Sequence, residues 1–199
     1  MRLLLPVKEC FARVLEKRIV LIVFGVLFVV GMALGIVFIK TPALYDYHLG
    51  RCESFLDSVC FSDRSVFLIF LERIGGHALI LVLLLAAGIH PAGLVITPVI
   101  IVFRAYTFGG SLAIFFSVYR MTGALVAIAF YIPVHILFDC VFLAAVALSF
   151  GRAFSFRFCK PDFGGLIKDF IVFIIFTAIV CIVEILLLLI LFHSVGNIL

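Results

Sequence analysis

The chain has 199 residues, of which 66% are hydrophobic and 13% are charged, with a formal net charge of +4. An ordinary soluble domain is nearer half apolar and about a quarter charged, so this composition excludes a water-soluble globular fold. The basic residues stand beside long apolar runs and form no basic aromatic surface, which indicates membrane topology rather than nucleic-acid binding. Because the apolar runs are continuous rather than alternating, we predict an all-α integral membrane protein and not a β-barrel.

Five apolar segments are long enough to cross the hydrocarbon core, which requires about 20 residues. The first, residues 19–39, is uncharged throughout and is followed by Lys40, Thr41 and Pro42. It is longer than the roughly 7–15 apolar residues of a signal peptide, so we predict an uncleaved anchor. The other four spans are predicted at residues 66–89, 93–118, 122–150 and 170–192.

The lysines and arginines near the ends of these spans predict their orientation. With five spans, the N-terminal segment 1–18 and the loop after the fourth span lie on one side of the membrane. They carry 9 basic residues, against 4 on the opposite side. The first set is Arg2, Lys8, Arg13, Lys17, Arg18, Arg152, Arg157, Lys160 and Lys168, and the second is Lys40, Arg51, Arg64 and Arg120. We therefore predict one membrane domain over residues 1–199, with a cytoplasmic N-terminus and an extracytoplasmic C-terminus.

Residues 40–65 form the one sizeable extracytoplasmic loop in this topology. Cys52 and Cys60 both fall in it, and an extracytoplasmic compartment permits a disulfide between them. A bridged pair and two free thiols agree equally well with the sequence. Cys140 and Cys181 lie within spans and are interpreted as small core residues.

Four ionisable residues stand out inside the predicted spans: Arg104, His135, Asp139 and Glu184. Each costs roughly 2.5–3.5 kcal/mol at the centre of a membrane helix, so each needs a partner or a polar cavity. His135 and Asp139 are four residues apart and share a helix face, where such a pair can relay protons or bind an ion. The alternative, which we favour, is that Arg104 neutralises Asp139 across neighbouring helices and that Glu184 bonds to a hydroxyl or joins that cluster.

Two pairs of glycines suggest features of helix packing. Gly31 and Gly35 form a GxxxG pattern on the first span, a spacing that lets two helix backbones approach closely. Gly109 and Gly110 indicate a bend or break in the third span, where irregular backbone is tolerated only inside protein or beside a cavity.

No enzyme signature is present in the sequence. An intramembrane metalloprotease needs two histidines and a glutamate on one helical turn, whereas the spaced pair here is His135-x-x-x-Asp139. Walker and Rossmann glycine patterns are also missing, so we predict a protein that is not an enzyme, with no cofactor and no metal. Glu72 and Arg73 lie near the outer interface and are predicted to reach water there.

The stretch from Phe70 to Gly151 resembles the stage II sporulation protein M family of bacterial membrane proteins. The resemblance rests on a sequence order of FLERIGGHALILVLLLAAGI, FRAYTFGGSLAIFF and ALVAIAFYIPVHILFD. The matching positions are Arg104, Gly109, Gly110, Pro133, His135 and Asp139. The first span, KRIVLIVFGVLFVVGMALGIVFIK, is similar as well, so that the resemblance covers most of the chain.

The resemblance implies a role in the complex that remodels septal peptidoglycan during engulfment of the forespore. The chain would be a non-enzymatic scaffold in the cell membrane, at the sporulation septum, that anchors two hydrolases, stage II sporulation proteins D and P. The docking surface would include Tyr45, Tyr47, Arg51 and Asp57 of the exterior loop. The alternative from a different class is a small transporter or permease subunit whose intramembrane polar residues line a path.

Overall fold

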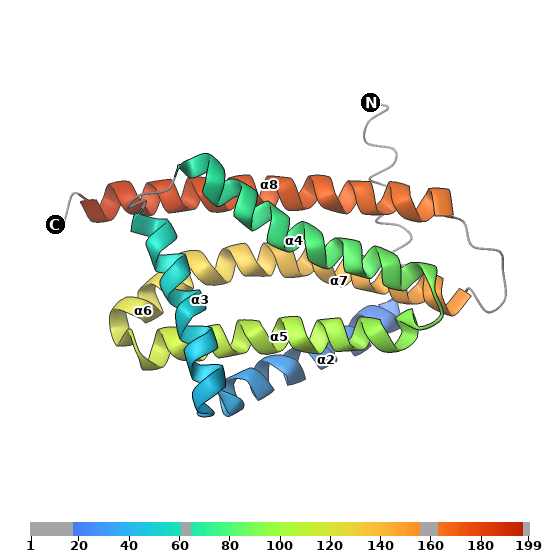
Figure 1. The fold of residues 1–199 in the computed structure, drawn as a ribbon, viewed down its shortest axis with the longest axis horizontal. Helices are drawn as coiled ribbons and strands as arrows, with labels where there is room; N and C mark the ends of the chain where they lie inside the picture. Colours follow the sequence, from blue (N-terminus) through green and yellow to red (C-terminus); the bar gives the residue numbers. More distant parts are fainter. Residues whose placement is uncertain (1–17, 61–64, 156–162, 197–199) are drawn as a thin grey trace.

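The computed structural model describes residues 18–60, 65–155 and 163–196, and every regular element in these ranges is helical (Figure 1). The elements are α2 (Arg18–Phe38), α3 (Pro42–Cys60), α4 (Val66–Ile89), α5 (Gly93–Ser117), α6 (Arg120–Val126), the π-helix η2 (Ala127–Tyr131), α7 (Ile132–Ser155) and α8 (Phe163–Gly196).

Within these described ranges, five helical units are long and apolar enough to cross a membrane, which confirms the predicted helical class and agrees with the predicted number of spans. They are α2, α4, α5, the continuous unit α6–η2–α7, and α8. The fourth unit, Arg120–Ser155, has 36 residues and extends beyond the predicted segment 122–150 at both ends.

The five spans alternate in direction, so the start of α2 and the end of α8 lie at opposite ends of the bundle (Figure 1). Most of the residues that predict which end is cytoplasmic, including segment 1–17, Arg157 and Lys160, lie outside the described residues. The cytoplasmic N-terminus therefore stays a prediction.

The segment expected to form an exterior loop is largely a helix, α3, which runs steeply across the spans near the end where α2 finishes (Figure 1). His48, Cys52 and Phe55 are its buried side chains, at 0%, 1% and 3% exposure. Their spacing of four and then three residues places them on one helix face, which packs against α5 and α8. The exposed face of α3 carries charged residues such as Glu53 and Asp57, so α3 is an amphipathic helix attached to the bundle rather than a sixth span.

The interior contains two separate apolar cores. One includes Leu81, Ile101 and Phe138, and the other, nearer α3, includes Phe55 and Phe108. Along α5, Arg104 falls between Ile101 of the first core and Phe108 of the second. The intramembrane charges therefore lie in a layer between the two apolar cores, which we call the polar layer.

Helix α5 is a single α-helix from Gly93 to Ser117, so the break expected at Gly109 and Gly110 does not occur. The glycines on α2 and α5 instead create a close helix contact. A Cβ atom added at Gly35 would strike the carbonyl oxygen of Tyr106, and one at Gly109 would strike that of Met32. At Gly31, an added Cβ would lie 2.9 Å from the Ala105 Cβ. Small residues on both helices thus let the two backbones meet.

Candidate functional site

An ion pair between α5 and α7 lies at the centre of the polar layer. The Arg104 Nε donates to Asp139 Oδ1 at 3.3 Å, and both residues are 6% exposed. The guanidinium also sits over the Phe138 ring, 4.7 Å from its centroid. The Arg104 Nη2 is buried and has no hydrogen-bond acceptor. Arg104 and Asp139 therefore neutralise each other, while one donor of the guanidinium is left over.

His135 is held beside this pair, although not through Asp139. Its Nδ1 lies 2.9 Å from the carbonyl oxygen of Tyr131, to which it donates. The imidazole stacks on the rings of Tyr131 and Phe108, with centroids 4.0 Å and 5.4 Å away. The four-residue spacing of His135 and Asp139 raised the prospect of a bond between them, but Nδ1 bonds to the backbone one turn earlier.

A second ion pair joins α4 to α8. The Arg73 Nε lies 3.5 Å from Glu184 Oε1, with side-chain exposures of 24% and 3%. This contact lacks hydrogen-bond geometry, since Oε1 accepts no hydrogen bond. Arg73 is partly exposed, and the prediction that it reaches interfacial water did not include this contact. Glu184 pairs with Arg73, whereas Arg104 pairs with Asp139.

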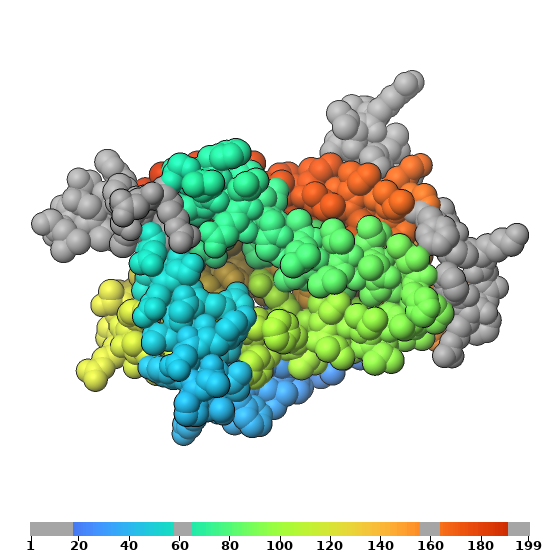
Figure 2. All heavy atoms as spheres, in the orientation of Figure 1, coloured from blue at the N-terminus to red at the C-terminus, as the bar shows by residue number. Residues whose placement is uncertain are grey.

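Two cavities adjoin the polar layer where α3, α4 and α5 meet, and Figure 2 shows the molecule hollowed there. The larger has a volume of about 550 Å³ and the smaller about 330 Å³. Both are lined by Arg51, Glu72, Arg73 and His135, so they are contiguous at these side chains. The larger cavity is further lined by Gly76, His77, Leu79, Ile80, Leu83, Val99, Ile100, Phe103, Arg104 and Thr107.

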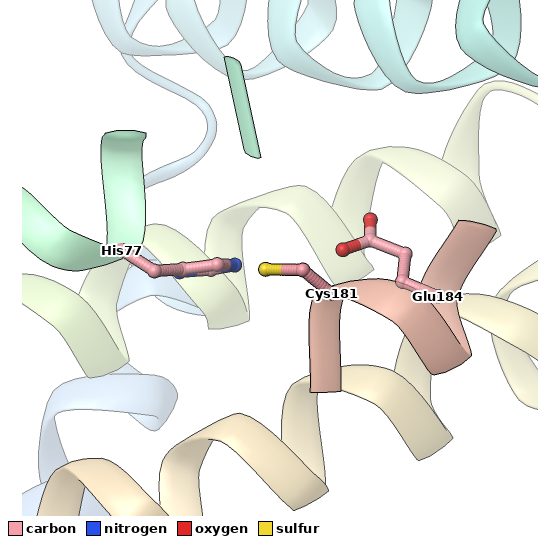
Figure 3. A group of neighbouring side chains, drawn as sticks. All are labelled: His77, Cys181 and Glu184. Carbon is pink, nitrogen blue, oxygen red and sulfur yellow. The ribbon is translucent and has the colours of Figure 1, made fainter. Parts of the chain in front are cut away.

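Three potential metal ligands face one another between α4 and α8 (Figure 3), and one of them, His77, lines the larger cavity. They are a ring nitrogen of His77 on α4, and the Cys181 sulfur and a Glu184 carboxylate oxygen on α8. Their ligand atoms all lie within 4.8 Å of one another. This group was not predicted, because His77 and Cys181 are far apart in the chain and match no local ligand motif.

A disulfide between Cys52 and Cys60, one of the two alternatives left open above, is incompatible with α3. The two residues lie eight positions apart on one helix, a separation of roughly 12 Å, whereas bridged cysteines have Cα atoms less than about 7 Å apart. Cys52 is a free thiol that donates to the Ser111 carbonyl oxygen at 3.5 Å. Burial raises its pKa to about 12, so it is unreactive at neutral pH while α3 is attached.

The buried face of α3 also explains Gly110. A Cβ atom at this position would collide with the imidazole of His48, whose ring lies 5.7 Å from that of Tyr106. Both His48 ring nitrogens are buried without a hydrogen-bond partner. Burial, and secondarily the charge of Arg51, lowers the pKa of His48, so the imidazole is neutral under α3.

These features define a multi-pass helical membrane protein with a cavity between its helices that several charged side chains line. The chain matches no protein-family model, and no significant match was found among curated proteins or solved structures.

Proposed function

We propose that this protein binds a small solute with an anionic group in the membrane cavity, as a small transporter or a permease subunit. The observation that carries the proposal is the buried Nη2 of Arg104, a donor that lacks an acceptor on a residue that lines the cavity. A buried, charged donor without an acceptor is costly, and the cost is larger inside a membrane.

The chemistry of the cavity wall suits a carboxylate or a phosphate group. Arginine offers a planar set of donors that binds either group through two parallel hydrogen bonds. Arg51 and Arg73 line both cavities together with one carboxylate, Glu72, so the side chains that line the cavities from Arg104 towards α3 include more arginines than carboxylates. The larger cavity also has the volume of a typical small-molecule site, about 300–1,000 Å³.

The position of the cavity suits transport because it reaches from α3 to the polar layer between the two apolar cores. Beyond this layer, the apolar core that contains Leu81, Phe138 and Phe142 is closely packed. A solute at Arg104 would therefore pass this core only if the helices rearranged.

Solute uptake into proteoliposomes containing the full chain tests this proposal. Panels of labelled carboxylates and phosphates would be compared between the wild type and Arg104→Gln/Asp139→Asn. This double variant removes both charges of the ion pair together and so leaves no buried ion unpaired. We expect it to fold and to lose uptake of the bound class. Arg120→Gln, which removes an exposed charge outside the cavity, is the matched control and should retain uptake. Wild-type vesicles that accumulate no member of either panel, or equal uptake by the double variant, would overturn the proposal.

A second candidate is the scaffold role implied by the resemblance to the stage II sporulation protein M family. The scaffold role is favoured because the residues that carry this resemblance lie at contacts between helices. Arg104 and Asp139 join α5 to α7. Gly109 packs against α2, and Gly110 packs against α3. Residues at such contacts stabilise a helix bundle, so their match supports a fold shared with this family. In this reading, stage II sporulation proteins D and P dock on the bundle at the septum.

The exposed face of α3 is the docking surface for these hydrolases in the scaffold proposal. It carries Asp46, Tyr47, Glu53 and Asp57, whereas Arg51 turns towards the cavities. Deletion of the gene should stall cells after the asymmetric septum forms, and the tagged chain should co-purify with hydrolases in mild detergent. Glu53→Lys/Asp57→Lys should weaken this co-purification, with Lys168→Glu on α8 as the control. Normal spore yield in the deletion strain would contradict the scaffold role.

A further inference from the structure

We propose that His77, Cys181 and Glu184 bind a divalent transition metal ion, with Zn²⁺ as the best fit. Nothing in the proposed functions requires this site, since a solute can bind at Arg104 without a metal. The proposal stands on the placement of three different ligand types around one point between α4 and α8 (Figure 3).

The backbone presents these ligands on fixed elements. Cys181 and Glu184 are three residues apart on α8 and so lie on the same helix face. His77 projects from α4 towards them, and its ring is stacked on Phe138 with centroids 3.8 Å apart. Helix positions held by packing make a more exact site than loop positions do.

Imidazole, thiolate and carboxylate together favour Zn²⁺. Thiolate selects against Mg²⁺ and Ca²⁺, while Zn²⁺ accepts all three ligand types in tetrahedral geometry. Tetrahedral ligand atoms around Zn²⁺ are about 3.5 Å apart. The three atoms lie within 4.8 Å of one another, so side-chain rotations that shorten each separation by at most roughly 1.3 Å bring them to this spacing. The Cys181 thiol loses its proton on binding, and the proton passes to water in the cavity.

The burial of the group supplies an independent argument. Cys181 and Glu184 are 0% and 2% exposed, and Glu184 Oε1 accepts no hydrogen bond. A buried carboxylate oxygen in a membrane helix without a donor is expensive. A metal ion satisfies it more fully than the 3.5 Å contact with Arg73 does. The carboxylate has two oxygens, so Arg73 can keep one of them while the metal takes the other.

The charges around the site determine what occupies the fourth metal position. The charged side chains near His77 and the cavity are Arg51, Arg73, Arg104, Glu72, Asp139 and Glu184, three of each sign. A divalent ion with one thiolate adds a net single positive charge to this balanced set. His77 lines the larger cavity, so an anion or hydroxide from the cavity can take the open position and cancel that charge.

Titration of the purified full chain with Co²⁺ in detergent tests the site. Co²⁺ takes the place of Zn²⁺, and a thiolate ligand gives it a charge-transfer absorption that oxygen and nitrogen ligands do not give. We expect this absorption to saturate at one Co²⁺ per chain and to disappear on addition of Zn²⁺. Absence of saturable Co²⁺ binding to the folded wild type would overturn the proposal, whatever the outcome of the solute uptake measurements.

Variants then assign the ligands. Cys181→Ser should abolish the charge-transfer absorption, and His77→Ala and Glu184→Gln should each weaken Co²⁺ binding. Cys140→Ser is the matched control, because Cys140 is an exposed thiol on α7 outside the group, and it should leave the absorption unchanged. Circular dichroism of each variant identifies loss of fold. An unchanged absorption in folded Cys181→Ser would assign the metal to another thiol and refute the site.

Discussion

The two faces of α5 contrast sharply. Towards α2, the helix presents Ala105 and Gly109, and it lies so close to that backbone that a Cβ atom added at Gly109 would strike the Met32 carbonyl oxygen. Towards α4, it presents Phe103, Arg104 and Thr107 to a cavity of about 550 Å³. In lipid, where apolar surface gains little by leaving one oily environment for another, close packing of small residues holds helices together. A helix anchored in this way on one face is able to line a cavity with charge on the other.

The largest effect is expected on the cavity face, from a change that leaves one charge of the ion pair unpaired. Asp139→Leu leaves the Arg104 guanidinium buried without its partner, which should cost about 3–5 kcal/mol of stability. Arg104→Met/Asp139→Leu removes both charges and should recover most of that loss. Unfolding in mixed micelles by a denaturing detergent measures both variants. Equal destabilisation by the single and double variants would contradict the pairing.

A smaller loss is expected on the α2 face. Gly109→Ala places a methyl group against the Met32 carbonyl and must separate the two helices, at a cost of about 1–3 kcal/mol. Gly75→Ala on α4 is the matched control, because nothing lies within 4 Å of a Cβ atom there. That control should be neutral or stabilising, by up to about 1 kcal/mol, since alanine favours helix more than glycine does. Equal stability of the two variants in the same unfolding assay would refute the close contact.

The smallest effect is expected at α3, where only one amphipathic helix detaches. The pKa of His48 is lowered from 6.5 in the folded state, so the detached helix binds a proton at a pH where the attached helix does not. Attachment is therefore strongest above pH 6.5 and weakens as the pH falls below it.

Labelling of Cys52 by a thiol reagent measures this detachment, because the thiol is buried under α3. The measured quantity is the ratio of the labelling rate of the wild type to that of His48→Gln at the same pH. We expect this ratio to increase as the pH is lowered from 7 to 5. Comparison at one pH cancels the common change in thiolate fraction. A ratio that does not change with pH would rule out control of α3 by His48.

The spans were predictable because each contains the roughly 20 apolar residues that a bilayer demands, a property that each segment carries locally. Tertiary contacts decided what the sequence did not show. Gly109 and Gly110 resemble a helix break in isolation, yet α2 and His48 fill the space beside them and the helix continues. The sequence signal for the contact between α2 and α5 is the GxxxG pattern at Gly31 and Gly35 taken together with these two glycines.

The polar layer was predicted in part. The pairing of Arg104 with Asp139 follows from the need to neutralise two intramembrane charges. The contact of Arg73 with Glu184 was missed because Arg73 stands near the start of its span, where a long side chain has a second route to water. The spacing of His48, Cys52 and Phe55 indicates an amphipathic helix at α3. The polar residues around them favoured a loop instead, so the helix was not predicted.

The π-helical turn Ala127–Tyr131 makes the alignment of the fourth span depend on its residue count. A π-turn holds one residue more than an α-turn, and each residue of a helix turns it by about 100°. The part after the turn, with His135 and Asp139, is therefore rotated relative to the part before it. Deletion of a single residue from η2 would rotate the part of the span that follows it. This rotation would move Asp139 away from Arg104 without changing either side chain.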